Sequence, residues 1–459
     1  MSRRGALLLV LLVLRAGGAV PAASQEGPAW DQALLRVQQG QYDSAVAEYL
    51  AALRREPQRY ELIEQSLLHA LEVEPAAAGM AGALEAALAR ARTEGGADLV
   101  PLARLTATCA LRRGNAARGL EIISELTRAE GEGDLLFWYA SRCEAARQPE
   151  VASRAYALLT PEGGDSPYLL VALQRQAEIA ARGRDAAQAV ALYRRLAASY
   201  PGSPEAAQAL WHVGRLELEK LGAADRARAA LQAALDSPHA GPWREGAAEL
   251  LAEVALREDD PSTARALLQR LRQQGGGAQY RARYRLAELD YLQLDFAQAR
   301  PALEALLRQD PAHDLANDAL VLLLRCEQLQ EAGPAAEHFA RAELRERQGR
   351  SAEAAPEWAW VAANAPPEVS QLALFTRARI LRNRGEVELS AELLRQLASV
   401  PQGAYAVAAA LGLGELREEQ GALQEALRTY ETALLAAPED ARAPELRLRI
   451  MRLRRLTSG

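Results

Sequence analysis

The feature that most constrains this chain is a set of five landmark residues whose spacing recurs. Gly40, Ala45, Tyr49, Ala52 and Pro57 follow one another at steps of five, four, three and five residues. The same steps separate Gly349, Ala354, Trp358, Val361 and Pro366, and again Gly421, Ala426, Tyr430, Ala433 and Pro438. An internal period of about 20 to 50 residues is typical of a solenoid, in which one structural unit is stacked on the next.

Each landmark suits one place in a pair of antiparallel helices. Glycine permits the tight turn between the two helices, the small residue allows close approach, the aromatic residue fills the gap to the neighbouring unit, and proline ends the second helix. Ala, Leu, Arg and Glu dominate the composition, and these residues favour helices. Further copies of the spacing begin at Arg184 and Leu294, and degenerate copies begin at Gly114, Asp259 and Gly385.

These landmarks closely resemble the tetratricopeptide repeat family across most of the chain. The resemblance implies an all-α, right-handed superhelical solenoid of tetratricopeptide-type helical hairpins that binds other proteins. The stretch from Tyr200 to Leu210 is also similar to bacterial envelope members of the family, such as outer-membrane assembly proteins and Tol–Pal cell-division coordinators.

The spacing also indicates how the chain is organised. We expect a signal peptide at 1–22, an N-terminal repeat array at 28–310, and a register change with an extra helix at 311–348, broken at Gly333-Pro334, within a continuous solenoid. A C-terminal array follows at 349–459, and its Arg-rich segment from Pro444 to Leu456 is predicted to cap the solenoid. Contact of that segment with an anionic envelope surface is the alternative.

The first residues have the pattern of an export signal. Arg3 and Arg4 precede an apolar stretch from Gly5 to Leu14, and cleavage is expected after Ala22 or, as the alternative, after Ser24. This stretch is shorter than the roughly 20 residues that span a bilayer, so no transmembrane span is expected in the mature chain. The predicted location is periplasmic or secreted; the alternative is an N-terminal anchor in the inner membrane.

A second pattern repeats on the first helix of successive units: a small residue, a charged residue and an aliphatic residue, as in Ala252-Glu253-Val254. The charged positions are Glu178, Arg215, Glu253, Glu288, Glu343, Arg379 and Glu415. In the family resembled, first helices line the concave face, which implies a charged stripe along a groove. The stripe could recognise a basic or mixed-charge peptide; alternatively, its side chains are solvated or pair between neighbouring repeats.

Two tryptophans are further candidates for binding a partner. Trp138 and Trp211 each lie three residues before the small position of their unit, which places them one turn away on the same helix face. They could form a stacking surface for a peptide or a glycan, because aromatic residues are favoured interface anchors. Packing between helices is the alternative.

Nothing in the sequence suggests catalysis, a metal or a cofactor. The three cysteines fit apolar positions, the five histidines are scattered without zinc-site spacing, and no nucleophile or phosphate-loop motif occurs. The net charge of −6 argues against a nucleic-acid partner, because a negative chain is repelled by phosphate groups.

The sequence therefore predicts a non-catalytic scaffold that binds proteins in the bacterial cell envelope. An accessory protein or enzyme acting on cell-wall glycan is the alternative.

Overall fold

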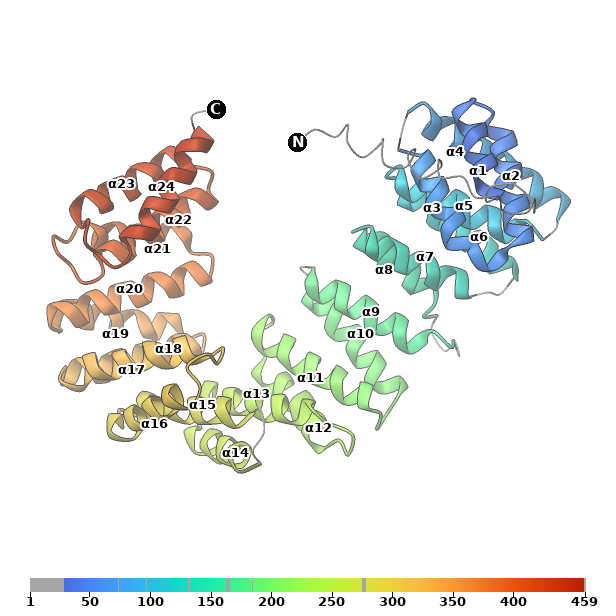
Figure 1. Cartoon of the computed structure of the whole chain (residues 1–459). Helices are drawn as coiled ribbons and strands as arrows, with labels where there is room; N and C mark the ends of the chain where they lie inside the picture. Colours follow the sequence, from blue (N-terminus) through green and yellow to red (C-terminus); the bar gives the residue numbers. More distant parts are fainter. Residues whose placement is uncertain are drawn as a thin grey trace, which may run out of the picture. The chain divides into compact units, whose positions relative to one another are not determined.

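The structure is a computed structural model that describes residues 29–72, 74–95, 97–130, 133–161, 166–183, 185–274 and 278–457. These residues form 24 α-helices, one short 3-10 helix and connecting turns, with no strand among them (Figure 1). Two compact units divide the chain, an N-terminal unit up to residue 184 and a C-terminal unit from Asp185 onward. The signal peptide predicted at 1–22 lies outside the described residues.

The N-terminal unit contains the 3-10 helix η1 (Pro57–Arg59) and the helices α1 (Ala29–Gln38), α2 (Tyr42–Arg55), α3 (Tyr60–Ala70), α4 (Ala76–Glu94), α5 (Leu99–Arg112), α6 (Ala116–Glu130), α7 (Gly133–Ala145), α8 (Pro149–Leu158) and α9 (Leu169–Arg182). Helices that follow one another in the chain pack together as hairpins, for example α1 with α2 and α5 with α6.

The C-terminal unit contains α10 (Ala186–Ser199), α11 (Pro204–Glu219), α12 (Ala224–Asp236), α13 (Trp243–Arg257), α14 (Pro261–Gln274), α15 (Ala278–Leu292), α16 (Phe296–Gln309), α17 (Ala316–Gln330), α18 (Pro334–Arg347), α19 (Ser351–Asn364), α20 (Pro367–Asn383), α21 (Val387–Ala398), α22 (Ala406–Glu419), α23 (Leu423–Ala436) and α24 (Ala443–Thr457). Its hairpins pair α11 with α12, α13 with α14, α15 with α16, α18 with α19, α20 with α21 and α22 with α23. The predicted all-α solenoid of helical hairpins is confirmed.

The landmark residues take the places that their chemistry indicates. Gly40 and Gly421 adopt left-handed backbone angles, with φ of 71° and 76°, at the turn inside their hairpins. Such angles are easy only for glycine. Where the sequence lacks glycine at this position, Asp259 and Leu294 adopt the same region, with φ of 60° and 63°. The turn geometry is therefore common to regular and degenerate repeats.

The core of each unit is built from the remaining landmarks. Ala45, Tyr49 and Ala52 are buried in the N-terminal unit, and the corresponding residues of each regular repeat in the C-terminal unit are buried as well. Burial of these side chains between stacked hairpins supplies most of the stabilisation of a solenoid, since each unit contacts mainly its neighbours.

The three cysteines belong to this core. Cys109, Cys143 and Cys326 are buried and free, as the apolar interpretation of their positions predicts. Burial raises the pKa of the Cys109 and Cys143 thiols to about 11 and that of Cys326 to about 12. A thiol is reactive only as the thiolate, so these groups are structural.

One helix, α17, interrupts the alternation of first and second helices. It packs on α16 as a first helix would, whereas the next helix, α18, packs along α19 instead. Between them lie Gly333, with φ of 54°, and Pro334, which opens α18. Within the described part of the C-terminal unit, α17 is therefore a first helix without a second helix of its own, a property that it shares with the last helix, α24.

The last helix, α24, buries Leu446, Ile450 and Leu453 against the preceding hairpin. Its other face carries arginines, but Leu448 and Met451 are exposed there as well, so this face is not wholly polar. Contact of α24 with an anionic surface stays a prediction.

Candidate functional site

Three pockets follow one another along the first helices of the C-terminal unit, with cavity volumes of about 410, 370 and 350 Å³. The first and second pockets share Glu288 and Arg347, and the second and third share Arg379. We call this row of three pockets the groove. Most of its lining residues lie on α11, α13, α15, α17, α18, α20, α22 and α24, and the second helices α14 and α21 contribute a few more.

Five of the seven charged positions predicted from the sequence line the groove. Glu253 and Glu288 line the first pocket, Glu343 and Arg379 the second, and Glu415 the third. One position per first helix reaches the groove because residues at equivalent points of stacked helices face the same side. The repeat therefore places a row of charges along this surface.

The acidic members of this row are neutralised by arginines. The Nε of Arg347, at the end of α18, donates to Oε2 of Glu253 at 2.9 Å, and its Nη1 lies 3.2 Å from Glu288. Burial alone would raise the pKa of Glu253, but the guanidinium groups of Arg347 and Arg257 lower it to about 2. Arg347 and Arg285 likewise lower the pKa of Glu288 against the effect of burial. Arg347 thus ties α18 to α13 and α15.

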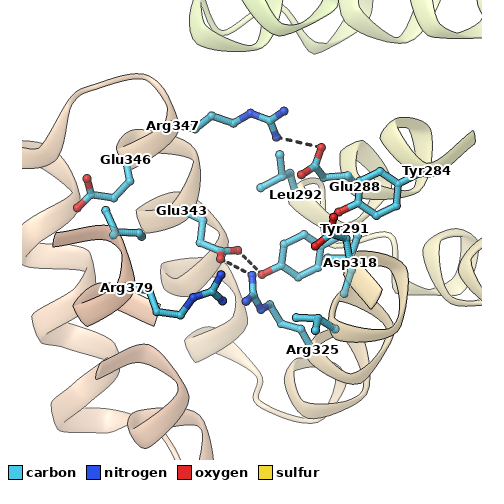
Figure 2. Close-up of a pocket in the computed structure, with 13 residues that line it drawn as sticks. Tyr284, Glu288, Tyr291, Leu292, Asp318, Arg325, Glu343, Glu346, Arg347 and Arg379 are labelled. Carbon is cyan, nitrogen blue, oxygen red and sulfur yellow. Dashed lines mark hydrogen bonds and ion pairs between the residues drawn. The ribbon is translucent and has the colours of Figure 1, made fainter. Parts of the chain in front are cut away.

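The second pocket has a buried polar floor, which Figure 2 shows. The Tyr291 hydroxyl donates to one oxygen of Glu343 at 2.5 Å, and Arg325 donates to the other oxygen at 2.5 Å (Figure 2). Burial raises the pKa of Tyr291 well above its ordinary value, so the phenol stays protonated. The Tyr291 hydroxyl and both oxygens of Glu343 are therefore paired, whereas the buried Nε of Arg325 has no hydrogen-bond partner among the described residues.

Two charges at the edges of the second pocket differ from this floor. Arg379 on α20 and Asp318 on α17 are both exposed, and neither has an ion pair among the described residues. Arg379 also lines the third pocket. A partner segment lying in the groove would meet one unpaired positive and one unpaired negative group, whereas the other charges along the middle of the groove are already paired.

In the third pocket Glu415 is held by two arginines. It accepts hydrogen bonds from Arg382 of α20 at 2.8 Å and from Arg449 of α24 at 2.6 Å. Pairing between neighbouring repeats, one of the alternatives for the charged stripe, therefore describes Glu415, whereas Glu253 pairs within its own helix and with the more distant α18.

Several groove residues were missed in the sequence, among them Asp318, Arg325 and Arg347. Arg325 occupies a charged position in the triplet Leu324-Arg325-Cys326, which follows Ala287-Glu288-Leu289 by 37 residues. The spacing could have revealed it, but leucine in place of a small residue hides the pattern. The repeat pattern does not mark Arg347. Its ion pair with Glu253 joins α18 to α13, and the two residues are 94 positions apart in the sequence.

The remaining predicted residues lie elsewhere. In the N-terminal unit, Trp138 packs edge-on against Tyr60 with ring centres 6.5 Å apart, and the Arg104 guanidinium lies 3.7 Å from the Tyr60 ring and 4.7 Å from the Trp138 ring. Glu178, on α9, pairs with Arg175 at 3.1 Å.

Trp211 and Arg215 are brought together in the C-terminal unit. The Arg215 guanidinium lies 4.9 Å from the Trp211 ring, and Trp243 lies 5.0 Å from it. Both predicted tryptophans are half-buried, and each is already contacted by an aromatic ring of another helix and by a guanidinium group. Neither lines the groove. Their role in binding a partner stays a prediction.

The described residues contain no group of three or more His, Cys, Asp or Glu side chains arranged to hold a metal ion. Over the same part of the chain, no helix combines the length and apolar character needed to cross a membrane. What the groove offers is a surface of mixed polar and apolar character with charges of both signs, which suits binding to a polypeptide.

Comparison with known proteins places this arrangement in context. A family model described as tetratricopeptide repeat matches residues 175–242, 339–404 and 375–444. No curated protein matches the sequence. Among solved structures, a tetratricopeptide repeat protein from Parabacteroides merdae is similar at 15% identity, covering 57% of this chain and 91% of its own, with a TM-score of 0.37.

Two other solved structures are similar over more of the chain. A monomeric mutant of IFIT1 with m7Gppp-AAAA has 12% identity, covers 93% of this chain and 90% of its own, and has a TM-score of 0.29. The APC/C hetero-tetramer Cut9–Hcn1 has 13% identity, coverage of 93% and 75%, and a TM-score of 0.26.

Proposed function

Because this chain is a tetratricopeptide-repeat protein, we propose that it is a non-catalytic scaffold of the bacterial cell envelope whose groove binds segments of partner proteins. Such repeats serve in general as protein-binding scaffolds. The envelope location rests on the leader pattern of residues 1–22, and the use of the groove rests on the pockets along the first helices.

The proposal rests on two charged side chains of the second pocket, Arg379 and Asp318, that form no ion pair among the described residues. Arg379 and Asp318 face the same pocket while the charges between them, including Arg325 and Glu343, are paired. A bound segment would therefore be selected by an acidic side chain near Arg379 and a basic side chain near Asp318. Complementary charges of this kind give specificity and faster association more than raw affinity.

The proposal is tested by reversing one of these charges. Immobilised Arg379→Glu protein should capture partner proteins from an envelope fraction about tenfold less than the original chain does, since an attractive contact becomes repulsive. Arg308→Glu is the matched control, because Arg308 is an exposed arginine on the second helix α16 and lines none of the three groove pockets. Equal capture by both variants and the original chain would count against the groove.

A further inference from the structure

The uncovered helix α17 carries a second surface of defined chemistry. In the hairpins of the C-terminal unit, each first helix is covered along its length by the helix that follows it, as α11 is by α12 and α22 by α23. Helix α17 is packed on α16, but α18 leaves it to pack with α19. Among the described residues, no second helix therefore packs along α17 as α12 packs along α11.

A second helix packs closely on a first helix only where the first residue of the charged triplet is small. At Gly214 and Gly414 even a Cβ atom would overlap Leu231 and Tyr430 of the covering helices. In α17 the same position is Leu324, and its side chain is 49% exposed. A leucine is accommodated there because its side chain is half-exposed and no helix among the described residues covers it.

Leu324 is part of a continuous apolar ridge. Leu320 and Val321 are 45% and 48% exposed, and they lie one turn before Leu324 on the same side of α17. We call Leu320, Val321 and Leu324 the α17 ridge. Val321 also borders the second pocket, whereas Leu320 and Leu324 line none of the groove pockets. Three large apolar side chains exposed side by side are typical of a surface that a partner covers.

The charges along the ridge indicate the partner. Asp314 and Asp318 precede the ridge in the chain, Glu327 and Glu331 follow it, and all four are exposed. Within the described residues only Glu327 has a basic partner, Arg300, at 3.5 Å. Arg325, the one arginine of α17, is held by Glu343. The ridge is thus apolar along its centre and negative at both ends.

This charge pattern disfavours a second copy of the chain. An antiparallel pairing of two α17 helices about the centre of the ridge would set Asp318 of one copy against Glu327 of the other. A parallel pairing would set each acidic residue against itself. Both arrangements bring like charges together, which opposes association. An anionic lipid surface is disfavoured for the same reason.

We propose that the α17 ridge binds a basic amphipathic helix of a partner protein, which takes the place of the absent second helix. Apolar residues of that helix would lie on Leu320 and Leu324, and its Lys or Arg residues would meet the carboxylates at the two ends. Binding of a helix by its apolar stripe is an established mode of peptide recognition. The two leucines that anchor this helix lie outside the groove, whereas Asp318 and Val321 also border the second pocket.

The test uses the full chain and two synthetic amphipathic peptides. They share one leucine stripe but carry either lysines or glutamates on the flanks, and binding is followed by fluorescence anisotropy. The lysine peptide should bind, and Leu320→Ser with Leu324→Ser should weaken its binding at least about tenfold through loss of both apolar anchors. Leu389→Ser is the control, since Leu389 is a 57% exposed leucine on the second helix α21; it should leave binding unchanged.

A charge-reversed variant completes the test. Asp314→Lys with Glu331→Lys should lose the lysine peptide and gain the glutamate peptide, because the charges at the two ends of the ridge then have the opposite sign, and neither residue lines a groove pocket. Thermal unfolding of each variant checks that the fold is retained. Equal binding of both peptides, or of neither, would overturn the proposal. So would concentration-dependent dimerisation in sedimentation experiments that Leu320→Ser with Leu324→Ser abolishes, because the occupant would then be a second copy.

Discussion

Replacing Arg347 with alanine should lower the free energy of unfolding by about 3–5 kcal/mol, the range measured when one partner of a buried ion pair is removed. Arg347 is 19% exposed, and Glu253 and Glu288, which it joins, are 17% and 20% exposed. Without the guanidinium group of Arg347, the negative charges of Glu253 and Glu288 would be neutralised less completely and would repel each other. Chemical denaturation followed by circular dichroism measures the loss.

Arg345→Ala is the matched control for this substitution. Arg345 lies on the same helix, but it pairs with Asp259 and Glu353, both of which are half-exposed. Exposed ion pairs contribute about 0–1 kcal/mol, so this variant should remain close to the original stability. If both variants lose the same free energy of unfolding, the ion pairs of Arg347 with Glu253 and Glu288 do not stabilise the fold as described.

The same ion pairs give an expected dependence on pH. The pKa of Glu253 is about 2 in the folded protein, whereas that of glutamate in an unfolded chain is about 4.3. A lowered pKa contributes stability in full above the unfolded value, and this contribution is lost as the pH falls toward 2. The difference in stability between the original chain and Arg347→Ala should therefore shrink below a pH of about 4.

Replacing Trp358 with alanine should also destabilise the C-terminal unit by about 3–5 kcal/mol, the usual cost of removing a large aromatic side chain from a core. Trp358 fills the aromatic landmark of its repeat, is 2% exposed, and packs edge-on against Phe339 with ring centres 5.0 Å apart. No neighbouring side chain can fill the resulting cavity without moving a stacked helix. Chemical denaturation again gives the measurement.

Trp360→Ala tests whether the repeat position, and not the residue type, determines the effect. Trp360 lies two residues further along the same helix, is half-buried, and stacks on His338 with ring centres 3.8 Å apart. Loss of one such ring contact costs about 0.5–1.5 kcal/mol beyond the buried area. Equal effects of the two substitutions would mean that the landmark spacing does not mark the core.

The repeat spacing explains why much of the fold could be predicted. Each landmark is a local requirement: Gly421 serves a turn of positive φ, and Ala426 and Tyr430 fill a contact that recurs between neighbouring helices. Local requirements leave a trace in the sequence at fixed steps. The charged positions from Glu253 to Glu415 were found for the same reason.

The partners of those charges could not be predicted in the same way. Arg347 meets Glu253 only because α18 does not cover α17 and instead reaches back to α13, which is a consequence of tertiary packing. The α17 ridge has the same origin. Leu324 is exposed because α18 packs along α19 and leaves α17 uncovered, and the repeat spacing does not reveal this packing. Departures from the repeat thus determine the most distinctive surfaces of the C-terminal unit.

Site-specific photo-crosslinking in a bacterial host tests the central claim, that partners bind along the groove, most directly. The photoreactive residue would replace Leu292, which lines the second pocket, or Ala408, which lines the third. Arg308, 71% exposed on the second helix α16, is the control position. We expect the same envelope protein to be crosslinked at Leu292 and at Ala408 but not at Arg308. Adducts only at Arg308, or no protein adduct at either groove position, would contradict it.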